Sequence, residues 1–171
     1  HHIQTEPLCQ STPGASLIPP ISRAMRTTRL KTRAALGVPE DVNLVLLTTG
    51  GIRGEIGCLE HLQETDRSWF IVPGGCEEGL ELRGNVVLLS HRSGFHHPDL
   101  ATASDFLVGK AGYGTIAEAR AAGASFAYVL RENFRESACL REYLAKEKMG
   151  FEISEEAFHS ASWLDRLDEL L

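Results

Sequence analysis

Short apolar runs alternate along the chain with segments whose apolar positions recur at helical spacing. The runs are bounded by glycine, proline or small polar residues and predict buried strands, whereas the helical spacing predicts amphipathic helices between them. The predicted strands are 42–48, 69–72, 85–90, 106–109, 126–130 and 151–153, and the predicted helices are 25–36, 56–64, 98–104, 115–122 and 137–148. Helically spaced leucines after Trp163 predict a last packed segment, 163–171.

This alternation predicts a Rossmann-like three-layer α/β/α domain whose parallel sheet has about six strands, joined by right-handed crossovers. In such sheets ligands bind beyond the carboxyl ends of the strands. Three loops rich in glycine or polar residues follow predicted strands, at 49–55, 90–97 and 110–115. The fold is expected to bring these loops to one rim, which indicates a ligand site there.

The loop before the fourth predicted helix has the most informative residues, within DFLVGKAGYGTIAEARAAG at 105–123. Gly112 and Gly114 are expected to permit a sharp turn and close approach of a ligand, and Thr115 to open the helix. Free backbone N–H groups and the positive helix end then favour an anion. Glu118, about one turn later, is expected either to close a capping box or to accept hydrogen bonds from a diol. The alternative to a nucleoside diphosphate site is a tight turn with a capping glutamate.

Residues 110–118, KAGYGTIAE, followed by Ala121-Ala122-Gly123, resemble the donor-site motif of nucleotide-sugar glycosyltransferases with the GT-B fold. The stretch 128–136, YVLRENFRE, resembles the next strand and loop of that family, and TTGGIRGE at 48–55 takes the place of its first glycine loop. The resemblance is closest to MurG-like transferases and to the glycosyltransferase-like part of L-arabinokinases. It runs from about Ile21 to near the C-terminus.

The resemblance implies glycosyl transfer from a UDP-sugar, with this domain holding the nucleotide and stabilising the leaving diphosphate. It assigns the ribose to Glu118 and the nucleotide phosphates to Gly50, Gly51, Arg53, Lys110, Gly112, Gly114 and Thr115. Candidates for the base are Ser93, Gly94 and Phe95, and candidates for the sugar are Arg131, Asn133 and Glu136. The catalytic base is expected in another domain, so no catalytic residue is assigned. No cofactor other than the donor substrate and no metal are expected.

Two departures from the family pattern leave the identity of the sugar open. Lys110 stands where the plant enzymes carry histidine, although a lysine supplies a mobile cation that suits a pyrophosphate. Ala124-Ser125 replaces the usual small residue followed by proline. The acceptor, the stereochemical outcome and the oligomeric state are not readable from the sequence.

The length of 171 residues suffices for one core but not for the two Rossmann-like domains that the resemblance implies. Residues 21–171 are therefore expected to be the C-terminal nucleotide-sugar-binding domain of a GT-B enzyme, which packs in the full-length protein against an absent N-terminal acceptor domain. This part alone is expected to be inactive. Residues 1–20 are expected to be a tag remnant, His1-His2, and a linker rich in proline, serine, threonine and glycine.

The net charge of −6 offers no basic surface for a nucleic-acid backbone. No apolar run approaches the ~20 residues of a membrane span, so a soluble cytoplasmic protein is expected. A basic run is interpreted as the solvated face of a helix: Arg23, Arg26, Arg29, Lys31 and Arg33. The four cysteines are far apart in the sequence and are expected to be reduced thiols: Cys9, Cys58, Cys76 and Cys139. His96-His97 is interpreted as a pair of loop residues.

Other functions fit the same residues. Gly112-x-Gly114-x-x-Ala117 satisfies a relaxed dinucleotide fingerprint, and Glu132 follows about twenty residues later, as in an NAD(P)-binding oxidoreductase domain. Two observations disfavour this interpretation: the motif follows the fourth predicted strand rather than the first, and the glycine-rich loop at 49–55 would then have no assigned role. A UDP-sugar hydrolase on the same fold and a non-catalytic sugar-nucleotide sensor are further alternatives.

Overall fold

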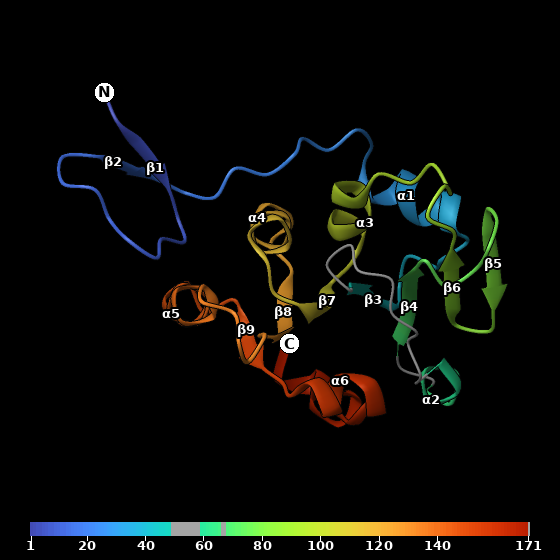
Figure 1. The fold of residues 1–171 in the computed structure, drawn as a ribbon. Helices are drawn as coiled ribbons and strands as arrows, with labels where there is room; N and C mark the ends of the chain where they lie inside the picture. The colour runs from blue at the N-terminus through green and yellow to red at the C-terminus, as the bar shows by residue number, and fades with distance from the viewer. Residues whose placement is uncertain (49–58, 66–67, 171) are drawn as a thin grey trace.

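The centre of the computed structural model is a seven-stranded sheet with the order β5-β6-β4-β3-β7-β8-β9 (Figure 1). The structure describes residues 1–48, 59–65 and 68–170. The strands are β3 (Asn43–Thr48), β4 (Ser68–Pro73), β5 (Leu80–Arg83), β6 (Val86–Leu89), β7 (Phe106–Lys110), β8 (Ser125–Val129) and β9 (Gly150–Glu152). Six of them are parallel, in the 3-2-1-4-5-6 order of a dinucleotide-binding fold, which confirms the predicted sheet.

One strand of this sheet, β5, was not predicted from the sequence. β5 pairs antiparallel with β6 at the edge of the sheet and is exposed on both faces, so its residues form no apolar run. Gly84, with φ of 59°, and Asn85 form the two-residue turn between these strands. That glycine-asparagine pair was the available sequence signal for the hairpin.

Helices cover both faces of the sheet, as Figure 1 shows. They are α1 (Arg29–Leu36), α2 (Leu59–Gln63), α3 (His97–Ala103), α4 (Tyr113–Ala122), α5 (Ser137–Lys146), α6 (Glu155–Ser160) and the 3-10 helix η1 (Ser162–Leu170). The core on one face packs against α1, α3, α4 and α5, and the core on the other against α2, α6 and η1. The three-layer α/β/α architecture is confirmed.

Alternation along β3 shows why the central strands read as unbroken apolar runs. Leu44 and Leu46 enter one core, whereas Val45 and Leu47 enter the other, and all four side chains are fully buried. A strand covered on both faces has no solvated positions to interrupt the run. Each such side chain contributes roughly 1.5–3 kcal/mol of transfer free energy.

The two central strands approach closely at Gly109. It pairs with Thr48, has a φ of 149°, and a Cβ at this position would collide with the carbonyl oxygen of Thr48. An L-residue therefore cannot occupy position 109 without moving the backbone of β3 or β7.

The first helix begins later than its basic run predicted. Thr28 is the N-cap of α1, and its Oγ1 accepts a hydrogen bond from the backbone N–H of Lys31. Arg23 and Arg26 therefore precede the helix, and the interpretation of the run as one solvated face is wrong. Arg33 is 1% exposed because it donates to carbonyl oxygens and to the carboxylate of Asp105.

The segment expected to be an unstructured linker contains two short strands. β1 (Ile3–Thr5) and β2 (Ser16–Ile18) form a separate parallel pair, with three residues in each strand, too few to register as a sequence pattern. The backbone N–H of Glu6 donates to the carbonyl of Ile18 at 3.0 Å and extends this pairing. In Figure 1 the chain then passes over α4 and α3 before entering α1. Within the described residues, no helix is long and apolar enough to cross a membrane.

Candidate functional site

The strand order reverses between β3 and β7, so the crevice beyond their carboxyl ends is the expected ligand position. The 110–115 loop follows β7, and the 90–96 loop follows β6. The third predicted loop follows β3 but falls within 49–58. Gly50, Gly51 and Arg53 consequently lie outside the described residues.

The N-terminus of α4 lies at this crevice, immediately after β7. The helix begins at Tyr113, two residues before the expected start at Thr115, with Gly112 as an N-cap that makes no side-chain capping bond. The predicted capping box between Thr115 and Glu118 is therefore wrong, because Thr115 already lies inside the first turn. As in any helix, the first backbone N–H groups have no acceptor inside the helix, and in α4 these are the amides from Tyr113 onward.

The two glycines at this helix start are not required by the protein's own conformation. Gly112 has extended backbone, φ −150° and ψ 163°, which any residue adopts, so the sharp turn expected of it is absent. A Cβ at Gly112 or at Gly114 would meet no other atom within 4 Å. Among the described residues, no side chain outside the immediate chain neighbours fills the space beside the amino end of α4, which suits the close approach of a ligand.

Glu118, on the same helix, is the buried polar centre of this edge, with 6% exposure. Its Oε1 accepts hydrogen bonds from Nε and Nη2 of Arg23 at 3.0 and 2.7 Å, and its Oε2 is 2.5 Å from Nδ1 of His97. Burial alone would raise the pKa of this carboxyl group, but the bonds from His97 and Arg23 hold the pKa below its usual value. Both oxygens of the predicted ribose-binding carboxylate therefore already have partners within the chain.

The segment that carries Arg23 is fixed across α3 and α4. The carboxylate of Asp99, 5% exposed, accepts hydrogen bonds from the backbone N–H groups of Arg26 at 2.7 Å and Thr27 at 3.3 Å. The ring of His96 lies 3.2 Å, through Nε2, from the carbonyl of Ala24. The residues that hold this segment were not predicted from the sequence. The capping threonine, Thr28, was the signal that the preceding arginines are not helical.

Lys110, the predicted phosphate-binding cation, ends β7. Its Nζ forms a 3.0 Å ion pair with Oε1 of Glu155 at the start of α6, and its side chain is 22% exposed. Hydrogen bonding by Lys110 lowers the pKa of the Glu155 carboxyl group. The lysine charge is thus directed at α6 in this structure rather than at the amino end of α4.

The candidates for the base follow β6. The backbone N–H of Ser93 donates to Ser90 at 3.1 Å, and Gly94 has a φ of 82°, so these residues form a tight turn. Phe95 is half-buried and packs against the core between the sheet and α3. Two residues later His97 contacts Glu118, so this segment reaches the site through a histidine.

The candidates for the sugar follow β8, the strand beside β7. The guanidinium carbon of Arg131 lies 5.1 Å from the centroid of the Phe134 ring, and Asn133 is exposed. Glu136 is the N-cap of α5 without a side-chain capping bond. These residues lie at the same edge of the sheet as α4's amino end, because β7 and β8 are parallel neighbours.

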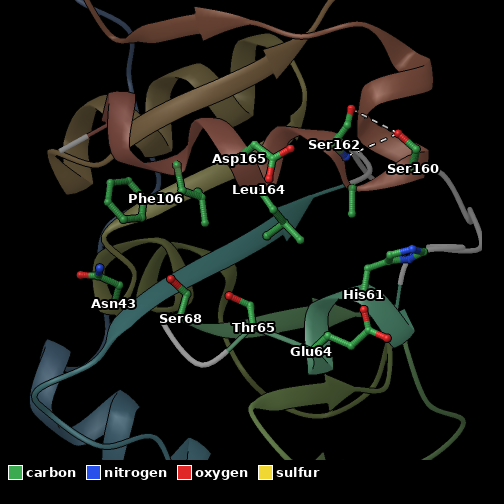
Figure 2. A pocket seen from close by; sticks show the side chains of 12 residues that line it. Asn43, His61, Glu64, Thr65, Ser68, Phe106, Ser160, Ser162, Leu164 and Asp165 are labelled. Atoms are coloured by element: carbon green, nitrogen blue, oxygen red, sulfur yellow. Dashed lines mark hydrogen bonds between the residues drawn. The ribbon is translucent and has the colours of Figure 1, made fainter.

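One cavity among the described residues lies at the edge of the sheet opposite the loop that precedes α4. It has a volume of about 550 Å³ and opens at the amino ends of β3, β4 and β7 (Figure 2). Its lining includes His61 of α2, Glu64 just after that helix, and Leu164 and Asp165 of η1. A second cavity, about 530 Å³, lies between the segment before α1 and α4, and Arg23 and Ala117 line it. Arg23, the partner of Glu118, and Ala117, its neighbour in the sequence, connect the predicted ribose position to this cavity.

Comparison with known proteins connects this geometry to glycosyltransferases. No family model matches the chain. L-arabinokinase of Arabidopsis thaliana is 32% identical over 151 residues, which make up 88% of this chain but 14% of that protein. The chain therefore spans only a small part of that relative.

Solved structures with a similar fold include three glycosyltransferases, each less than 25% identical. SnogD from Streptomyces nogalater has a TM-score of 0.55 at 19% identity, covering 93% of this chain and 46% of its own. The spinosyn forosaminyltransferase SpnP has a TM-score of 0.62 at 15% identity, with 98% and 47% covered. The calicheamicin glycosyltransferase CalG4 has a TM-score of 0.58 at 18% identity, with 76% and 35% covered. The chain therefore has the Rossmann-like α/β fold that these GT-B glycosyltransferases share.

Proposed function

We propose that this domain binds a sugar nucleotide, of the UDP-sugar class, and serves glycosyl transfer in the full-length protein. The observation that carries the proposal is the amino end of α4 at the switch point of the sheet, with unfilled space at Gly112 and Gly114 and with the buried Glu118 one turn further on. The similarity to L-arabinokinase and the shared fold of three glycosyltransferases support the same class.

The diphosphate would bind at the first turn of α4. The amides of Gly114 and Thr115 have no acceptor inside the helix, and the helix dipole favours negative charge there. Negative charge grows on the diphosphate as the bond to the sugar breaks, so fixed donors at this position lower the barrier. Lys110 would add a cation by exchanging its partner Glu155, which is 60% exposed, for a phosphate oxygen.

The ribose would bind at Glu118, and this requires a change of partners. A diol needs free lone pairs on the carboxylate, whereas Arg23 and His97 now occupy both oxygens. Arg23 is the partner that can leave, because its side chain is 62% exposed and water can solvate the released guanidinium. Nucleotide binding is thereby coupled to the position of the segment before α1.

Calorimetric titration of the chain with UDP and, separately, with NAD tests the proposal. UDP is expected to bind. Gly114→Ala and Lys110→Ala are each expected to weaken UDP binding about tenfold. The alanine methyl group at position 114 would block the close approach of the diphosphate to the helix, and the second change removes the cation. Lys146→Ala is the matched control, because it deletes another ion-paired lysine, whose partner is Glu6 of the N-terminal segment. Thermal unfolding of each variant establishes that the fold is retained.

The outcomes separate the function classes. Binding of NAD without binding of UDP would favour an oxidoreductase domain and contradict the proposal. Absence of binding to either nucleotide would also contradict it for this chain. With UDP binding established, incubation of the full-length protein with a UDP-sugar distinguishes transfer to an acceptor from hydrolysis and from simple sensing.

A further inference from the structure

Two cysteines that are far apart in the sequence meet on the surface of the molecule. The Sγ atoms of Cys9, in the N-terminal segment, and Cys139, in the first turn of α5, are 2.7 Å apart. Both are free thiols in this structure. The approach of these two cysteines was not predicted from the sequence, and it arises because the 3–18 segment folds back on the domain. Sulfur atoms at this separation are already inside the ordinary contact distance of unbonded thiols.

Independent contacts hold the N-terminal segment in this position. Nζ of Lys146, further along α5, pairs with Oε1 of Glu6 at 2.8 Å. The hydroxyl of Tyr113 lies 3.6 Å from Sγ of Cys9 and 3.8 Å from Sγ of Cys139. The proximity of the two sulfurs therefore belongs to a docked segment rather than to one chance pair of side chains.

We propose that Cys9 and Cys139 form a reversible intramolecular disulfide, made by exchange with a low-molecular-weight disulfide such as oxidised glutathione. A disulfide has an S–S distance of about 2.05 Å, so the two sulfurs need to approach by only roughly 0.7 Å. The proposal concerns these two residues alone and does not depend on the nucleotide-binding function.

The exposure of the two thiols sets the order of the exchange. Cys9 is exposed, so its thiolate attacks one sulfur of oxidised glutathione, forming a mixed disulfide and releasing one glutathione thiolate, which takes up a proton. The Cys139 thiolate then attacks the Cys9 sulfur and expels the second glutathione. Two protein thiols lose two electrons and two protons, and one glutathione disulfide becomes two thiols.

The buried partner suits the second step. Cys139 is half-buried, and its Sγ donates to the carbonyl of Glu136 at 3.1 Å. Burial raises the pKa of the Cys139 thiol, which disfavours its direct attack on a disulfide in solution. Its reaction with Cys9 is intramolecular, and the high effective concentration of the nearby sulfur keeps this step fast although only a small fraction of Cys139 is thiolate.

Peptide mapping of the intact chain tests the proposal. The protein is equilibrated with defined ratios of oxidised to reduced glutathione, the remaining thiols are alkylated, and the chain is cut with trypsin without reduction. A linked species joining peptide 1–23 to peptide 136–141 is expected, and reductant should separate it. Cys76 is the internal control, because its thiol donates to backbone carbonyls, including that of Leu88 at 3.4 Å, and it should remain alkylated as a thiol.

Cysteine variants and gel mobility distinguish the intramolecular disulfide from glutathione adducts and from a disulfide-linked dimer. Cys9→Ser and Cys139→Ser should each abolish the linked peptide, whereas Cys76→Ser should leave its yield unchanged. The oxidised protein should run as a monomer without reductant, at all protein concentrations. The proposal is overturned by separate glutathione adducts on Cys9 and Cys139, by a linked dimer, or by equal cross-linking through Cys76.

Discussion

Arg23 and Glu118, 95 residues apart in the sequence, are joined by two hydrogen bonds to one carboxylate oxygen, at 3.0 and 2.7 Å. The arginine is 62% exposed and the glutamate 6%. A surface residue thus neutralises a buried charge from a segment that precedes the first helix of the domain. The bond links any ligand of Glu118 to the position of that segment.

Removal of Arg23 should strengthen nucleotide binding if Glu118 receives the ribose. Arg23→Ala deletes a competitor for the carboxylate oxygen, so the Kd for UDP should fall roughly twofold to tenfold in calorimetric titration. Arg26→Ala removes the same charge three residues later, where only the backbone N–H contacts Asp99, and should leave the Kd unchanged. Weaker binding in Arg23→Ala would instead assign the guanidinium to the ligand.

The ionised Glu118 should stabilise the protein only above acidic pH. Its pKa in the folded state is held below the usual 4.5, so the unfolded chain binds the proton more tightly. The stabilisation is complete above the unfolded pKa and is lost as the pH falls through the folded one. The difference in free energy of unfolding between the wild type and Glu118→Gln should therefore shrink between about pH 6 and about pH 3. A pH-independent difference in urea unfolding would contradict this.

Arg33 should be the most costly of the basic residues to remove. It donates to Asp105 at 2.7 Å and to the carbonyls of Ala103 and Val42, each at 2.9 Å, while being 1% exposed. Arg33→Met removes this donor from the two carbonyls, whereas Asp105 keeps its bond from the backbone N–H of Leu44, and the change should cost about 2–4 kcal/mol in urea unfolding. Arg29→Met is the control, because Arg29 contacts the same carboxylate but is 39% exposed, and should cost about 1 kcal/mol or less.

Two glycines of one motif should respond oppositely to alanine. Gly109→Ala forces a Cβ onto the Thr48 carbonyl at a φ of 149° and should destabilise the protein by about 2–4 kcal/mol. Gly114→Ala meets open space in a helix and should stabilise it by up to about 1 kcal/mol while weakening UDP binding. Thermal unfolding measures both, and a large loss of stability in Gly114→Ala would show that this glycine serves the fold instead.

The sheet was predictable because its central strands are buried on both faces. Val45 and Leu47 extend the same apolar run as Leu44 and Leu46, as expected of a short strand buried on both faces and bounded by polar residues. The strand at Leu80 was missed because exposed residues on both faces erase the alternation. Hydrophobic periodicity in a sequence therefore reflects burial of the side chains, and an exposed edge strand buries too few side chains to produce a recognisable pattern.

The site was predictable only as far as local chemistry determines it. The amino end of α4 follows from Gly112 and the apolar strand before it, and the position of Glu118 follows from helical spacing. The contacts of Glu118 with Arg23 and His97 depend on tertiary packing across many intervening residues, which no local pattern encodes. The same holds for the meeting of Cys9 and Cys139.

The pairing of Thr48 with Gly109 has a consequence for how the chain folds during synthesis. β3 reaches its neighbour β4 early, but its other edge stays unpaired until β7 has left the ribosome, with β4, β5, β6 and α3 made in between. Nascent chains that end before Phe106 therefore expose the backbone donors and acceptors along one edge of this central strand. A chaperone or a second nascent chain would meet that edge first, so translation through β7 is the interval in which this domain is most prone to aggregate.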